Sequence, residues 1–138
     1  MTTYKYIKKL VEKHSNIENI GIKDRHEFIR DCRYAYMKLC YLYINNFSLN
    51  MCAKNVGKKS HVTVINGLTM FDRHYKTNNF KANEIYYICN IKLHAEKVKF
   101  IEKNAEDKLV YINELIESYI NLKDSYIKEL NVNYETIK

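Results

Sequence analysis

The apolar residues of this chain recur at spacings of three and four along most of its length, the period of an α-helix with one buried face. The first such helix is predicted over residues 3–14. Its apolar face carries Tyr4, Ile7, Leu10 and Val11, and lysines occupy the opposite face. The polar segment SNIENIGIK then breaks the pattern, so we expect a loop before the next helix.

A second helix is predicted to begin near Asp24, whose carboxylate suits an N-cap, and to end at Asn45 and Asn46. The stripe expected to be buried consists of Phe28, Cys32, Ala35, Leu39 and Leu42. Tyrosines interleave with basic residues in this segment, which leaves open stacking on the bases of a single strand. We expect core positions for most of them, because aromatic residues at helical spacing are usually packed inside.

Residues 48–77 are predicted to form a helix-turn-helix. Ser48 caps a short helix, and Gly57 follows that helix where a left-handed backbone is normally required. Two lysines complete the turn, and Ser60 caps a longer helix. The inward-facing positions of the two helices are Leu49, Cys52, Ala53, Val56, Val64, Leu68 and Phe71.

From residue 83 onward, one apolar repeat with alternating spacings of three and four continues along the chain. Its positions are Ile88, Ile91, Ala95, Val98, Glu102, Ala105, Leu109, Ile112, Ile116, Tyr119, Lys123, Tyr126 and Leu130. Spacing of this kind over many heptads is typical of a coiled-coil seam, in which single polar residues set register or oligomeric state. We therefore expect this segment to form a homodimer.

Two features of the same segment keep an alternative open. The polar residues 103–107 could fold the segment back into an intramolecular helical hairpin. Further apolar residues also widen the stripe beyond a strict seam, as in a helix that packs against more than one neighbour.

The composition agrees with helices throughout. Pro is absent and Gly occurs 3 times in 138 residues, and the length suits one domain with an extension. We therefore predict an all-α fold, in which a helix-turn-helix domain is followed by long C-terminal helices.

The positive charge is concentrated in the first part of the chain. Residues 1–83 hold 15 of the 23 Lys and Arg and 6 of the 16 Asp and Glu, whereas residues 84–138 hold 8 and 10. We take residues 1–83 as one domain and residues 84–138 as a C-terminal dimerisation region. A net charge of +7 that is carried by one part favours a polyanion as partner.

Several other classes of protein lack support in the sequence. No apolar run is long enough for a membrane span, and the first residues do not have the pattern of a signal peptide. The four cysteines form no CxxC pair and lie among apolar neighbours, so buried free thiols are expected rather than a metal site. No HExxH, nucleophile elbow or phosphate-cradling loop occurs, so we expect neither an enzyme nor a protein with a cofactor or small-molecule substrate.

The segment from Ser48 to Val64 reads SLNMCAKNVGKKSHVTV. It resembles, without a gap, the motif S-L-x-E-I-G-x-x-F-G-G-R-D-H-[ST]-T-V of the C-terminal DNA-binding domain of DnaA, the bacterial replication initiator. The resemblance covers roughly residues 24–77 and implies a Trp repressor-like helix-turn-helix. The positions that match in identity include the capping serine, the glycine of the turn, His61 and Thr63.

The resemblance also implies which residues meet DNA. Those expected to read base edges in the major groove are Lys59, Ser60, His61, Val62 and Thr63, and Asn66 could reach an adenine one turn further on. Lysine and serine replace the Arg and Asp of the motif, so a different target sequence is expected. Arg25, beside Lys23, is the candidate for the minor groove. Phosphate contacts are expected from Lys54, Lys58, Arg30, Arg33 and Lys76.

The expected function is therefore binding of double-stranded DNA by a homodimer that reads two half-sites. A small transcriptional regulator or an accessory replication factor, from a phage or mobile element, fits the resemblance. Such a protein would act in the cytoplasm of a bacterial cell or a phage-infected host. The alternative is a helical interaction protein that works through its coiled coil and does not bind DNA.

Overall fold

The computed structural model describes residues 2–23 and 26–137, with side chains through residue 131. Within these residues the chain is helical and contains no strand, which confirms the predicted all-α fold. The elements are α1 (Tyr4–Ser15), α2 (Glu27–Tyr43), α3 (Leu49–Asn55), α4 (His61–His74) and α5 (Asn83–Ile137). The chain divides into two units, of which the first ends at Lys97 and the second begins at Val98.

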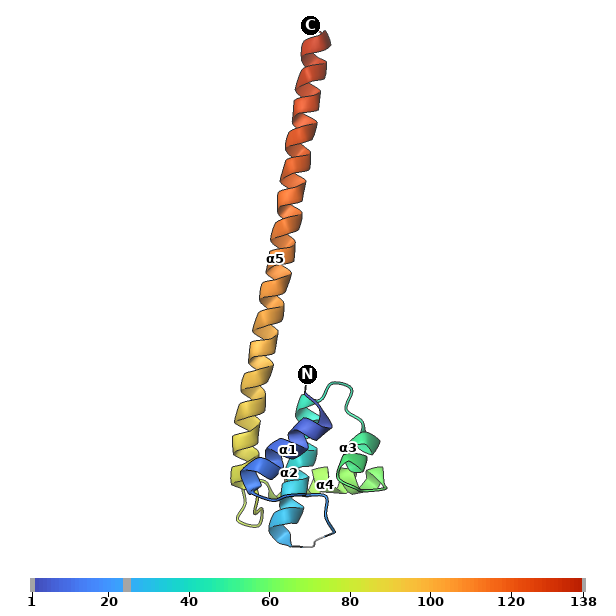
Figure 1. Cartoon of the computed structure of the whole chain (residues 1–138), viewed down its shortest axis with the longest axis vertical. Coiled ribbons are helices and arrows are strands. Elements are labelled where there is room, and N and C mark those ends of the chain that lie inside the picture. The colour runs from blue at the N-terminus through green and yellow to red at the C-terminus, as the bar shows by residue number, and fades with distance from the viewer. Residues whose placement is uncertain (1, 24–25, 138) are drawn as a thin grey trace. The chain divides into compact units, whose positions relative to one another are not determined.

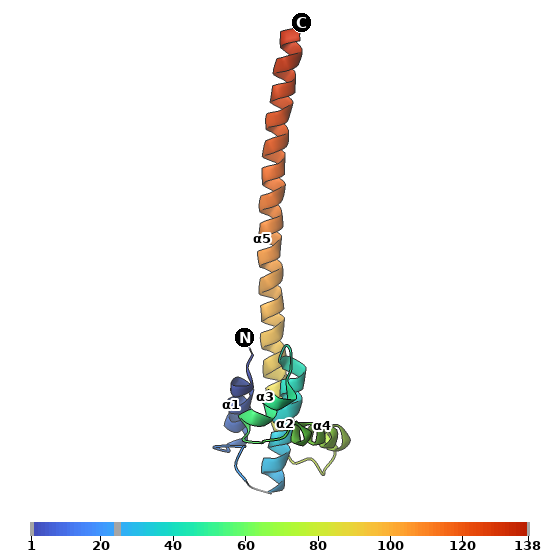
Figure 2. The ribbon, with the colours of Figure 1, turned by 90° about the vertical axis from the view of Figure 1, so that its right-hand side faces the viewer.

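Helices α1 to α4 and the start of α5 make up the first unit (Figure 1). Helix α2 packs against α1 and α4, and α3 packs against the same two helices. Figure 2 shows α4 running crosswise to α2. The predicted apolar face of α1 is confirmed, since Ile7, Leu10 and Val11 are buried.

Helix α2 begins at Glu27, later than the sequence pattern predicted. The imidazole of His26 serves as N-cap and accepts a hydrogen bond from the Phe28 N–H at 3.4 Å. Asp24, the predicted cap, and Arg25 lie outside the described residues.

The buried side of α2 is larger than the predicted stripe. Cys32, Ala35 and Leu39 are buried as expected, and Tyr36 is completely inaccessible as well. Leu42, in contrast, is 42% exposed, so its predicted burial is wrong. It lies in the last turn of α2, where the apolar side of the helix is only partly covered.

The core of the first unit also includes the beginning of α5. Ile85, Tyr86, Cys89 and Leu93 are buried with the residues of the other helices. The ring centres of Tyr86, on α5, and Phe71, on α4, lie 4.7 Å apart. The first unit therefore extends to Lys97, past the boundary at residue 83 that we placed where the charge changes sign.

The second unit is the remainder of α5. This helix is continuous from Asn83 to Ile137, so the polar residues 103–107 remain helical and the hairpin alternative is wrong. All residues from Val98 to Asn131 are exposed.

Two further predictions concern the chemistry of the chain. All four cysteines are free and buried, as expected from their apolar neighbours. In the described part of the chain, no helix combines the length and apolarity that crossing a membrane would require.

Candidate nucleic-acid interface

Helices α3 and α4 are joined by a tight turn with the predicted caps. The Ser48 hydroxyl accepts from the Met51 N–H at 3.3 Å, and the Ser60 hydroxyl accepts from the Val62 N–H at 3.1 Å. Gly57 has a φ of 71°, in the left-handed region. The Lys58 N–H closes the end of α3 by donating to a carbonyl of that helix at 2.9 Å. Local sequence therefore sets the geometry of this turn.

The start of α4 is open to solvent. The predicted base-reading residues Lys59, Ser60, His61, Val62 and Asn66 are exposed, and Thr63 is half-buried. The buried side of α4 is formed instead by Val64, Gly67 and Phe71. The first two turns of α4 thus present an exposed surface of mixed polar and apolar side chains.

The exposed face of α4 is longer than the sequence analysis predicted. Ile65 is 47% exposed, and Thr69 is exposed one turn further, with its hydroxyl donating to the Ile65 carbonyl at 2.9 Å. Both residues follow Val62 at helical spacing. That spacing could have predicted that Ile65 and Thr69 lie on the exposed face of the helix.

A cationic cluster forms beside the turn, around Lys58. Partial burial lowers the pKa of Lys58, and the positive charges of Arg33 and Lys23 lower it further. Lys23 belongs to the loop between α1 and α2, so the structure brings it close to a lysine that lies far away in the sequence. Because these positive charges lie close together, an anion placed at this point would be attracted by several of them at once.

Two glycines hold that loop against the turn. A Cβ atom on Gly21 would lie 2.9 Å from the Val56 carbonyl oxygen, closer than such atoms approach in proteins. Gly57 lies opposite, where a Cβ atom would be 3.7 Å from the Gly21 carbonyl oxygen. The Glu12 carboxylate also fixes the loop by accepting from the Ile20 N–H at 2.9 Å. This packing positions Lys23 beside the turn.

Arg33 does not occupy the surface position that we expected. It is 8% exposed, and one nitrogen of its guanidinium donates to the carbonyls of Ile20 and Ile22 at 3.0 and 3.3 Å. Arg33 therefore holds the loop that carries Lys23, and we no longer count it among the groups that touch phosphate. Its charge still contributes to the cationic cluster.

The other predicted phosphate contacts are scattered. Arg30 pairs with Asp31 at 3.3 Å and lies 5.9 Å from the ring centre of Tyr34. Lys54, on α3, and Lys76 are both exposed. Lys76 follows the C-terminal end of α4, about 20 Å from the start of the helix. Arg25, the minor-groove candidate, lies outside the described residues.

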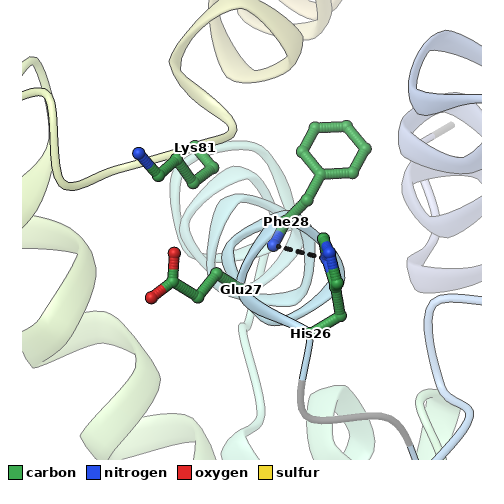
Figure 3. A pocket seen from close by; sticks show the side chains of 4 residues that line it. All are labelled: His26, Glu27, Phe28 and Lys81. Atoms are coloured by element: carbon green, nitrogen blue, oxygen red, sulfur yellow. Dashed lines mark hydrogen bonds between the residues drawn. The ribbon is translucent and has the colours of Figure 1, made fainter.

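The rest of the first unit offers little competing chemistry. A surface pocket at the start of α2 is lined by His26, Glu27, Phe28 and Lys81, and Figure 3 shows these side chains spread around the end of the helix. Its lining combines one carboxylate with one ammonium group. No group of three or more His, Cys, Asp or Glu side chains that could hold a metal lies together in the described residues.

Comparisons of the chain with protein-family models, with curated proteins and with solved structures found no match. The likeness to DnaA therefore stays a prediction that depends on the residues from Ser48 to Val64.

Proposed function

We propose that this protein binds double-stranded DNA through α3 and α4, with the start of α4 in the major groove. The observation that carries the proposal is the cationic cluster around Lys58, where Lys23 comes close to the turn, beside an exposed helix start. Clustered positive charges attract phosphate, and the N–H groups at a helix start add to that attraction.

The residues proposed to read bases lie next to this cluster. His61 and Asn66 can donate to or accept from base edges, and Lys59 can donate to guanine. Val62 and Ile65 offer apolar surface suited to thymine methyl groups. This combination supports recognition of a sequence and is more than a purely electrostatic contact requires.

The proposed setting is the one that the likeness to DnaA implies. The chain would be a small transcriptional regulator or an accessory replication factor of a phage or mobile element. A homodimer formed through residues 98–131 would present two copies of α4 to two half-sites. The exposed apolar residues of that segment support self-association.

A selection of bound duplexes from random DNA, followed by titration of the enriched duplex at several salt concentrations, tests the proposal. We expect affinity to fall steeply with salt, and Lys58→Ala, which removes a proposed phosphate contact, to reduce the slope of log K against log salt by about 0.9. His61→Ala should cost about 1–3 kcal/mol on the enriched duplex and little on an unrelated one. Lys9→Ala removes an exposed lysine of α1 and serves as the matched control.

Failure to bind duplex at low salt would refute the proposal. The second candidate function would then take its place, because residues 98–131 still expose a long row of apolar side chains. In that case the segment would be the working surface of a helical interaction protein, and the basic first unit would dock on an acidic partner.

A further inference from the structure

Residues 98–130 form an uninterrupted helix whose apolar seam has no partner in the described chain. In heptad notation, the a positions are Glu102, Leu109, Ile116, Lys123 and Leu130, and the d positions are Val98, Ala105, Ile112, Tyr119 and Tyr126. The exposed fraction of the large apolar residues in this seam runs from 38% at Val98 to 68% at Tyr119. Monomeric proteins rarely leave so long an apolar strip in water, so the seam calls for a partner helix.

The two charged residues of the seam distinguish between the possible orientations of such a partner. Glu102 and Lys123 are the two a residues that are not apolar. In a parallel, in-register pair each a residue faces its own copy, which would place two carboxylates in one layer and two ammonium groups in another. Like charges within an apolar seam oppose association.

We propose that the partner is a second copy of this chain, paired antiparallel, with Val98 opposite Leu130 of the second copy. This inference rests on the homodimer that forms part of the proposed function. In this register Ile112 faces Ile116 of the second copy, so the centre of the seam is apolar. The full segment from 98 to 130 is overlapped, and the two-fold symmetry repeats every contact.

The register also gives both charged residues a partner of opposite sign. Lys123 faces Ala105 of the second copy, and the small side chain leaves room for the lysine stem. Glu102 of the second copy lies three residues from that alanine, about 4.5 Å along the helix axis, within reach of the ammonium group. Glu102 in turn faces Tyr126 of the second copy, whose hydroxyl can donate to the carboxylate.

The contact is large enough for a stable dimer. The 33 paired residues extend over about 50 Å. Each copy contributes seven large apolar side chains at a and d positions, and burying on the order of 100 Å² for each gives roughly 700 Å² per copy. Apolar residues at the flanking e and g positions, including Leu115 and Ile120, add to this area. Typical specific interfaces bury about 800 Å² per partner.

Distances between spin labels test the orientation in the full chain. Glu114→Cys and Lys128→Cys place a label at the same outward heptad position, so both pairs have the same lateral separation. In the proposed register the two Glu114 positions coincide along the axis, whereas the two Lys128 positions are about 42 Å apart. The native cysteines are buried, and the unsubstituted chain, treated in the same way, gives the labelling background. Equal distances at the two positions would overturn the antiparallel arrangement.

Charge reversal tests the pairing of Glu102 with Lys123. In the proposed arrangement Glu102→Lys and Lys123→Glu each replace two attractive contacts by two repulsive ones, and each should weaken dimerisation about tenfold or more. The double variant should restore the dissociation constant to within about threefold of the original. In a parallel pair each of these residues faces its own copy, so a reversed charge still meets a like charge and dimerisation changes little. Single variants that dimerise as well as the original chain, or a double variant that does not recover the original affinity, would overturn the pairing.

The outcomes separate this inference from the proposed function. Sedimentation equilibrium of the unsubstituted chain should give twice the mass of one chain, and a single-chain mass at all concentrations would overturn both the orientation and the proposed homodimer. DNA binding by the first unit is measured independently in the titrations described above. A dimer with equal label distances would overturn the orientation alone.

Discussion

Gly57 offers the sharpest test of how the turn is built, because its backbone is left-handed with a φ of 71°. In Gly57→Ala the added Cβ would meet no atom closer than 3.7 Å, so the substitution changes backbone energy and not packing. A left-handed alanine costs about 1–2 kcal/mol. The lower entropy of the unfolded chain offsets about 0.4–1 kcal/mol of this. The net loss of stability is therefore about 1 kcal/mol, or about 4–8 °C in Tm for a unit of this size.

Thermal unfolding followed by near-UV circular dichroism is the suitable assay, since buried tyrosines such as Tyr36 and Tyr86 report on the first unit. Gly57→Asn is the matched control. Asparagine already adopts this conformation twice in the chain, at Asn16 with a φ of 59° and at Asn46 with a φ of 56°. We expect the Asn variant to unfold within about 2 °C of the original chain. An alanine variant as stable as the asparagine variant would refute the reasoning.

Three further predictions concern the first unit. Arg33→Met keeps the apolar stem but leaves two loop carbonyls without their donor. The free energy of urea unfolding should therefore fall by about 1–3 kcal/mol. An unchanged unfolding midpoint would contradict this role of Arg33. The hydrogen bond from Tyr6 to Glu96 raises the pKa of Tyr6 from 10.0 to about 12. The stability that this phenol contributes should therefore be present below pH 10 and lost as the pH rises towards 12. Over that range Tyr6→Phe should lose less free energy of unfolding than the original chain. In Gly67→Ala the new Cβ would lie 2.3 Å from the sulfur of Met37, so α2 and α4 must separate or Met37 must move. We expect the free energy of chemical unfolding to fall by about 1–3 kcal/mol. Undiminished stability would show that Met37 can move aside without cost.

The parts of the candidate site that depend on neighbouring residues were predictable. The caps at Ser48 and Ser60 and the left-handed Gly57 follow from side-chain and backbone preferences within a few residues, and the structure confirms all three. The proximity of Lys23 to Lys58 was not predictable in this way. It depends on the packing of Gly21 against Val56, a contact between segments that are distant in the sequence.

Arg33 illustrates the same limit. Its sequence neighbourhood is that of an exposed basic residue, and a basic side chain is almost never buried without partners. Two backbone carbonyls from another segment supply those partners, and they exist only after the loop between α1 and α2 has folded against α2. The pattern of apolar and polar residues along the sequence cannot reveal such a contact.

The sequence by itself determined that the chain is helical, where most helices begin and end, and that an apolar seam continues beyond the first unit. These features depend on periodicity and on local capping, which are properties of short segments. Tertiary structure alone decided that the start of α5 belongs to the core, that Leu42 is exposed and that Arg33 is buried. Each of these outcomes depends on which distant surfaces meet, because burial is a property of the packed chain and not of any one segment.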